Sequence, residues 1–396
     1  MMNAVKSATD LLDDRTYHIE FNGHLTNHVK HAVVALAGLG AEPERIQSYY
    51  DQYAELTPYG YGLESPVASQ YVIDESNWKA LLGKRTSFSA YCEFFDERER
   101  RLGTEELLAR YVPELLPGWV GAFTHATIHL GWALDADSRW MMIEGLAYMA
   151  FAYDSCHPER SRPGRSSGAT VVESLLLIAA AWEAGRGLED WVEAVIADTE
   201  SPAVKAMHPE LVRSGLQYRI GRLLAEGHPL IDATPAWIDG QDVCISWEQL
   251  RYVVALVYLA QPGDFIYLHA ITSLHAMEQI AERLAEEDRH AAVRCFWMGM
   301  LCILFAQGRF PGTQALETLH RTYRDAVDAA DGSAGESWDE IVVRAVQEDE
   351  EHNPKMVYVL RRWWTESERR TIYREAARHF TTTPELPKSF EQPPTT

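Results

Sequence analysis

The sequence predicts an all-α fold. Apolar residues recur three and four positions apart along most of the chain, which is the period of a helix with one buried face. The alternation typical of strands is scarce and limited to short pieces such as residues 70–74. The histidines of interest spread from residue 28 to residue 352, so a site built from them needs the whole chain. We therefore expect one large multi-helix domain over residues 1–383, with a flexible Pro-rich tail over 384–396.

Each expected helix is bounded by ordinary start and stop signals. The first ends at Gly38 and Gly40, and the one that opens at Thr104 has acids in its first turn. A polar segment rich in Pro, Gly, Ser and Arg over 157–169 predicts a mobile lid or crossover, and 240–245 marks another break. The expected helices cover residues 24–41, 45–56, 87–103, 104–118, 119–136, 138–153, 170–185, 246–263, 264–287, 288–308, 337–364 and 367–380.

Composition excludes several classes of function. The chain has 396 residues, of which 46% are hydrophobic, and a formal net charge of −22. This charge repels phosphate backbones and anionic lipid surfaces, so we expect neither a nucleic acid nor a membrane partner. No apolar run is long enough to predict a transmembrane helix or a signal peptide. The five cysteines are scattered without a CxxC pair, which indicates a reduced, cytoplasmic protein.

Two histidines stand four residues apart in FTHATIHLGW, at His125 and His129. On a helix they leave the same face, and two buried imidazoles need partners. A metal ion would satisfy both, and so would hydrogen bonds within a core, and the spacing alone does not choose. The pair lacks the neighbouring acid of an HExxH motif, so a zincin-type base is absent.

Further candidates lie on other apolar segments. His28 precedes the run VKHAVVAL, and His352 and Lys355 stand three apart in EEHNPKMVYVL, on one face of a helix. His269 and His275 are six apart, which turns them about 240° from each other and excludes a shared ion. The sequence has no P-loop, no nucleophile elbow, no paired ExxH motif and no glycine-rich turn after a strand.

These segments together resemble the questin oxidase-like family, which includes oxygenases that cleave anthraquinone rings and Baeyer–Villiger-type oxidases. The HxxxHLG block and the late HxxK block are the more specific pieces, and their ordered combination is more informative than either alone. The matching stretches cover residues 27–41, 78–103, 123–134, 143–153, 265–277 and 350–360.

The resemblance implies one Fe(II) ion held by histidines and by a lysine that CO2 has carboxylated. The implied site residues are His28, His125, His129, His269, His352 and Lys355. His352 and Lys355 are also the implied catalytic residues, and the choice between His269 and His352 as the fourth nitrogen ligand stays open. Pro354 lies between His352 and Lys355, so the segment is either the start of a helix or a kink.

The chemistry of a modified lysine is coherent. Burial lowers the pKa of a lysine and favours the neutral amine, which reacts with CO2 to give an anionic oxygen ligand. The alternative for Lys355 is a surface lysine paired with Glu348 or Glu351.

We therefore expect an O2-dependent oxygenase that acts on an aromatic polyketide, such as an anthraquinone or a xanthone-like polycycle. The reaction would be ring cleavage or a Baeyer–Villiger-type oxygen insertion. Some family members depend on NADPH, which here would act through a partner reductase or in a non-enzymatic step, because no nucleotide-binding fingerprint is present. The alternatives are a zinc-dependent hydrolase that uses the same ligands and a non-catalytic helical ligand-binding protein. The sequence also allows a homodimer without specifying one.

Overall fold

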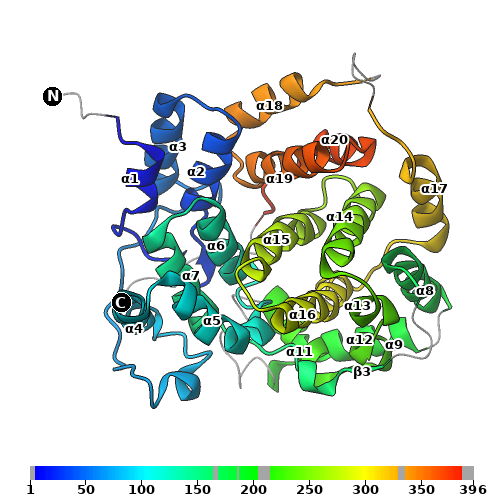
Figure 1. Cartoon of the computed structure of the whole chain (residues 1–396), viewed down its shortest axis with the longest axis horizontal. Coiled ribbons are helices and arrows are strands. Elements are labelled where there is room, and N and C mark those ends of the chain that lie inside the picture. Colours follow the sequence, from blue (N-terminus) through cyan, green and yellow to red (C-terminus); the bar gives the residue numbers. More distant parts are fainter. Residues whose placement is uncertain (1–4, 164–167, 185–186, 204–214, 329–334, 386–396) are drawn as a thin grey trace.

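The computed structural model describes residues 5–163, 168–184, 187–203, 215–328 and 335–385, and helices form most of this structure (Figure 1). In the first half of the chain the α-helices are α1 Ala8–Leu12, α2 Val29–Gly38, α3 Pro43–Glu55, α4 Phe88–Leu102, α5 Thr104–Leu115, α6 His125–Asp135, α7 Arg139–Phe151, α8 Val171–Glu183 and α9 Leu188–Ala197. In the second half they are α11 Gly215–Glu226, α12 Pro229–Asp232, α13 Ala236–Gly240, α14 Val243–Ala260, α15 Phe265–Ala281, α16 Glu286–Phe305, α17 Thr313–Tyr323, α18 Trp338–Gln347, α19 His352–Glu366 and α20 Thr371–Ala377.

Short 3-10 turns and very short strands connect these helices. The 3-10 turns are η1 Trp78–Leu81, η2 Leu116–Gly118, η3 Pro158–Arg160 and η4 Asp198–Glu200. Strand β1 Glu20–Phe21 pairs antiparallel with β2 Leu25–Thr26, and β3 Arg162–Pro163 pairs parallel with β4 Ala233–Thr234. The all-α prediction is confirmed, although the expected strand at residues 70–74 is irregular backbone.

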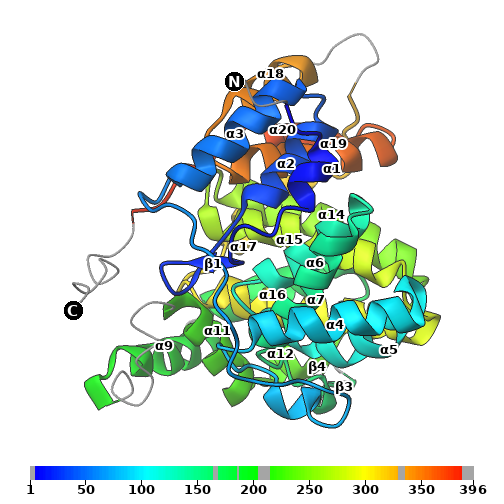
Figure 2. The same cartoon turned by 90° about the vertical axis from the view of Figure 1, so that its left-hand side faces the viewer.

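Helix α6 lies at the centre of the fold, packed against α7 on one side and α15 on the other. Two glycines let the backbones approach closely. A Cβ atom at Gly131 would lie 2.3 Å from the carbonyl oxygen of Ala276 in α15, and one at Gly145 would lie 2.5 Å from the Cα of Leu130 in α6. This close packing fixes the relative positions of the helices that carry His125 and His269. Figure 2 shows α2 and α3 stacked beside α18, α19 and α20 above this layer.

Three of the helix boundaries that differ from the expected ones lie next to candidate histidines. The helix expected over 24–41 begins only at Val29, because residues 25–26 form β2. The helix expected over 119–136 begins at His125. The helix expected over 337–364 is two helices, α18 and α19, separated by residues 348–351. The last two differences bear directly on the site.

Three segments singled out in the sequence have distinct outcomes. The break at 240–245 is confirmed, since α13 ends at Gly240 and α14 begins at Val243. The segment 157–169 contains η3 and β3, while residues 164–167 and most of the Pro-rich tail lie outside the described residues.

Among the described residues, α14 is long and apolar enough to cross a membrane, but 67% of it is buried inside the protein, as in the core helices of non-membrane folds.

Candidate metal centre

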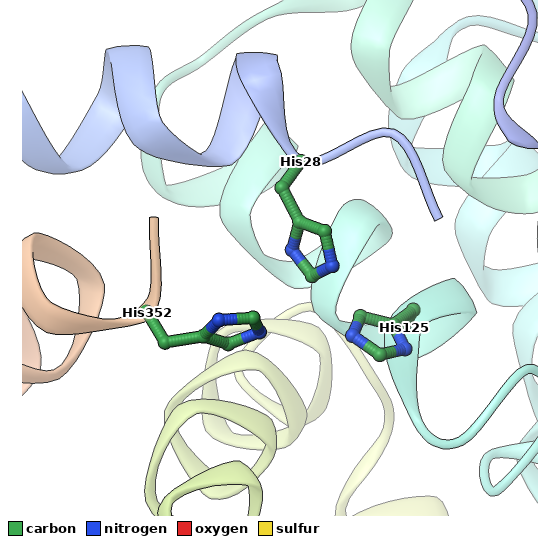
Figure 3. Close-up of side chains that lie close together, drawn as sticks. All are labelled: His28, His125 and His352. Carbon is green, nitrogen blue, oxygen red and sulfur yellow. The ribbon is translucent and has the colours of Figure 1, made fainter. Parts of the chain in front are cut away.

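Three histidines from distant parts of the chain converge at the ends of three helices. His28 caps the N-terminus of α2, His125 is the first residue of α6, and His352 is the first residue of α19. Their rings point toward one another (Figure 3), and one nitrogen of each lies within 4.8 Å of the others. All three side chains are buried. The helical fold therefore gathers residues separated by more than 300 positions into one cluster.

His269 adds a fourth imidazole from the first half of α15. Its Nε2 atom lies 3.2 Å from Nε2 of His125, and its ring centroid lies 4.8 Å from that of His352. The side chain is fully buried. The structure thus places both His269 and His352 in the cluster, although the sequence offered them as alternatives.

Hydrogen bonds fix which nitrogen of each ring faces the cluster. The Nδ1 atom of His125 lies 2.7 Å from the carbonyl oxygen of Ala122, and that of His269 lies 2.7 Å from the carbonyl oxygen of Phe265. A carbonyl oxygen only accepts, so each Nδ1 carries the proton and donates, which leaves a lone pair on Nε2. Nδ1 of His352 likewise lies 2.7 Å from the Glu350 carboxylate.

The lone pairs on these nitrogens are suited to a cation. With both Nδ1 atoms protonated, the facing Nε2 atoms of His125 and His269 have no proton to share across 3.2 Å. Nε2 of His352 is buried and has no hydrogen-bond partner among the described residues. Acceptors that hold Nδ1 while Nε2 points inward are the usual support of histidines that bind metals. The residues present therefore fit a metal ion.

Lys355 lies at the same cluster, one turn along α19 from His352. Its Nζ atom is 2.7 Å from Nδ1 of His28, and the side chain is fully buried. Pro354 lies within the first turn of α19, so the segment is a helix start and not a kink. The shared face of His352 and Lys355 is confirmed, and the alternative of a surface lysine is wrong.

Burial sets the charge of the cluster. It lowers the pKa of His125 to about 3 and lowers the pKa values of His28, His269 and His352 well below the usual range. Burial also lowers the pKa of Lys355. The imidazoles are therefore neutral at pH 7, which is the form that binds a metal.

Two neighbouring acids were missed as site residues in the sequence. Burial raises the pKa values of Glu350 and Glu351, which immediately precede His352. Glu350 also accepts the backbone N–H of His352 at 2.9 Å, so it holds that residue at two points. Adjacency to His352 was the only signal, since neither acid stands at a ligand spacing.

The backbone before His125 is strained. Ala122, Phe123 and Thr124 have φ values of 50°, 51° and 68°, a left-handed conformation that residues with a Cβ rarely adopt. This turn carries the Ala122 carbonyl to the His125 ring and places Phe123 against His269, with ring centroids 4.5 Å apart. Such strain persists only where the surrounding structure enforces it, and it often occurs at functional sites.

His129 lies apart from the cluster, contrary to the expectation that it shares an ion with His125. Its Nδ1 atom is 2.9 Å from Nε2 of His31, and its Nε2 atom is 3.3 Å from the Glu144 carboxylate. Lys30 completes this second group through an ion pair of 2.7 Å with Glu144. Both ring nitrogens of His129 are therefore engaged away from His28 and His352. His275 is separate too, as its spacing predicted, and bonds Asp135 at 3.1 Å.

The fold and this site define an all-helical protein with a buried cluster of histidines that could hold a metal ion. The profile of the questin oxidase-like family matches residues 25–360, and the chain belongs to that family. Relatives include the oxidoreductase AflY of Aspergillus parasiticus, 30% identical over 142 residues, which are 33% of this chain and 28% of AflY. The Baeyer–Villiger oxidase AgnL3 of Paecilomyces divaricatus is 27% identical over 145 residues, 34% of this chain and 30% of the relative.

A third relative is the Baeyer–Villiger oxidase mdpL of Emericella nidulans, 28% identical over 151 residues, which are 35% of this chain and 33% of mdpL. The aligned stretches thus span about a third of each relative. By name, each of these three relatives is an oxidase or an oxidoreductase.

Proposed function

We propose that this protein is a non-heme iron oxygenase that uses O2 to cleave, or to insert oxygen into, the ring system of an aromatic polyketide. The observation that carries the proposal is the set of inward-facing lone pairs on His125, His269 and His352, each fixed by an acceptor at Nδ1. The names of the relatives support an oxygen-inserting reaction, and membership of the family supports a quinone-type or related polycyclic substrate.

The ion would be held by His28, His125, His269 and His352, together with Lys355 in a carboxylated form. Bound Fe(II) supplies the one-electron chemistry that lets O2 react with a closed-shell organic molecule. Four neutral imidazoles bring no negative charge, whereas a carbamate on Lys355 adds one. A site with this donor set is unlike the closed tetrahedral arrangement typical of structural zinc.

Lys355 has the surroundings that carboxylation needs. The neutral amine nitrogen forms a bond to the carbon of CO2 and then loses one proton, which gives an anionic carbamate. Burial favours that neutral amine, and Glu350 and Glu351 lie next to the helix start as proton acceptors. The carboxyl oxygen Oε2 of Glu351 is buried and has no partner in the part of the chain that the structure describes, so it is available for such a proton.

The remaining residues orient the ligands and exclude water. Glu350 fixes the ring of His352 through Nδ1, and the carbonyls of Ala122 and Phe265 fix the rings of His125 and His269. The ring of Phe265 lies 4.7 Å from that of His352, and Phe123 covers His269. This apolar cover strengthens electrostatic interactions inside the site and limits the loss of reactive species to water.

Metal content provides the first test. Protein purified without chelators should contain one equivalent of iron per chain by elemental analysis, and it should consume O2 when a hydroxylated anthraquinone is added. His269→Ala should lose most of the iron. His275→Ala is the matched control, because His275 is equally buried on the same helix but bonds Asp135, and it should keep its iron.

Carboxylation has its own readout. Lys355→Met should bind iron weakly, whereas the unmodified wild-type protein, refolded without CO2, should regain iron affinity when bicarbonate is added. Stoichiometric zinc with no O2 consumption would contradict the proposed oxygenase and favour a hydrolase. Protein that holds no metal at all would refute the proposed centre.

A further inference from the structure

The left-handed turn before His125 needs support from another part of the fold. Ala122, Phe123 and Thr124 all have positive φ values, and none of them is glycine. This conformation is unfavourable for a residue with a Cβ atom, so it persists only where contacts enforce it. The turn carries the Ala122 carbonyl, which orients the His125 ring, and the Phe123 ring, which packs against His269. A shift of this turn would therefore disturb two members of the histidine cluster.

Gln217 supplies a contact to this turn from α11, 94 residues further along the chain. Its side-chain oxygen Oε1 accepts the backbone N–H of Phe123 at 2.5 Å. A backbone N–H only donates, so this bond fixes the orientation of the side-chain amide and turns Nε2 away from the turn. The N–H groups of the two residues after Phe123 donate to carbonyls within the turn itself. The bond to Gln217 therefore ties the strained backbone to a distant helix.

Asp154, in the loop after α7, binds the other end of the same amide. Nε2 of Gln217 donates to Oδ2 of Asp154 at 2.8 Å. The loop is fixed in turn, because the N–H of Cys156 donates to the Pro117 carbonyl at 2.6 Å. Gly221 leaves room for the carboxylate, since a Cβ atom there would lie 2.5 Å from Oδ2 of Asp154. The side chain of Gln217 is thus bound at both ends, between the loop and the turn.

We propose that Gln217 is a positioning residue of the metal centre, which holds the Phe123 backbone so that Nε2 of His125 points into the cluster. It acts through the turn, which keeps the Ala122 carbonyl against Nδ1 of His125 and so keeps the lone pair on Nε2. Asp154 assists by holding the amide of Gln217 in the required orientation. The inference rests on the proposed metal centre, although one of its tests needs no metal.

Binding of Co²⁺ tests the proposal, because the visible absorption of this ion reports both its affinity and the geometry of its ligands. Gln217→Leu removes both hydrogen bonds at similar volume, so the affinity for Co²⁺ should fall by about 10- to 100-fold and the spectrum should change. Gln249→Leu is the matched control, because Gln249 also accepts a backbone N–H, that of Val171 at 3.3 Å, but lies on α14 outside the cluster. It should bind Co²⁺ with the affinity and spectrum of the wild type.

A rescue variant separates the loss of this hydrogen-bonded pair from a general loss of packing. In Gln217→Glu two carboxylates face each other, so the affinity for Co²⁺ should fall as in Gln217→Leu. Adding Asp154→Asn reverses the direction of the bond, because the new amide donates to the new carboxylate, which still accepts the N–H of Phe123. The double variant should recover most of the lost affinity. An affinity as low as that of Gln217→Glu alone would contradict the proposed pairing.

The tautomer of His125 gives a readout that needs no metal. In metal-free protein labelled with ¹⁵N-histidine, the signal that His125→Ala removes should show the Nδ1–H form in the wild type and a mixture of both tautomers in Gln217→Leu. A wild-type tautomer together with wild-type Co²⁺ affinity and spectrum in Gln217→Leu would overturn the proposal. Wild-type protein that takes up no Co²⁺ would refute the metal centre instead, and the tautomer would still decide whether Gln217 positions His125.

Discussion

The strongest single test of the site separates His125 from His129, which stand four residues apart on the same helix. His129 bonds His31 and Glu144, so His129→Ala removes both contacts and leaves the His31 ring with neither nitrogen paired. An orphaned buried polar group costs about 1–3 kcal/mol, and the cavity left by the ring adds roughly 2 kcal/mol. We expect the free energy of unfolding to fall by about 3–5 kcal/mol while the iron content stays at the wild-type level.

His125→Ala should have the opposite pair of effects, a large loss of iron and a small loss of stability. It removes an inward-facing Nε2 atom, so iron content should fall sharply, and its effect on the stability of the metal-free protein should be smaller. Urea denaturation of metal-free protein, followed by circular dichroism, gives the stability, and elemental analysis gives the iron. His129→Gln is the control, because an amide restores one hydrogen bond and should recover about half of the loss.

The result that would refute the reasoning is a loss of iron in His129→Ala with little loss of stability in the metal-free protein. That outcome would mean that His129 binds the ion beside His125, as the spacing in the sequence suggested, and that the contacts to His31 and Glu144 are secondary.

Two further predictions concern the stability of the fold, one through the buried carboxyl of Glu278 and one through the close helix packing at Gly131. The pKa of Glu278, about 7, lies above its ordinary value of 4.5 because of burial, with Arg251, Glu366 and Glu282 facing it. The native state therefore holds a proton that the unfolded state has lost, so stability should fall by up to about 3 kcal/mol as pH rises from 4.5 to 7. Glu278→Gln should remove that part of the slope, and parallel unfolding curves for the two proteins would contradict the assignment. Gly131→Ala should lower the melting temperature and the iron content together, since its Cβ would collide with α15. Gly240→Ala is the control, because a Cβ there meets no atom of the described residues within 4 Å, and it should change neither.

The sequence specified the elements better than their ends. Helical periodicity identified the helices that carry the site, because their buried faces are long and apolar. It did not locate the start of α6, since the left-handed turn over 122–124 contains no glycine and depends on contacts with distant residues such as Gln217. The division of the helix expected over 337–364 was missed for a similar reason, because residues 348–351 favour a helix by composition.

The spacing of candidate ligands along the sequence correctly predicted that His352 and Lys355 lie together, but it wrongly predicted the same for His125 and His129. His352 and Lys355 share a face at the start of a helix, and this local geometry brings both to the cluster once α19 packs against α2. His125 and His129 leave α6 on neighbouring positions, but the partner of each is chosen by another helix: α15 for His125 and α2 for His129. Contacts between helices far apart in sequence are not encoded in the local period. Only the structure could therefore show that His269 joins the cluster as its fourth histidine and that His129 does not.

Three of the four converging histidines sit at the beginning of a helix, and this has an electrostatic consequence. The free amide groups at the N-terminus of α2, α6 and α19 carry partial positive charge, so three helix dipoles direct their positive ends at one buried point. In a chain with a net charge of −22, these three helix ends add positive potential to the interior of the site. It disfavours protonated imidazoles and favours bound anions, which include a carbamate and a deprotonated phenol. The fold itself therefore supplies part of the attraction for anionic groups that the acidic surface does not provide.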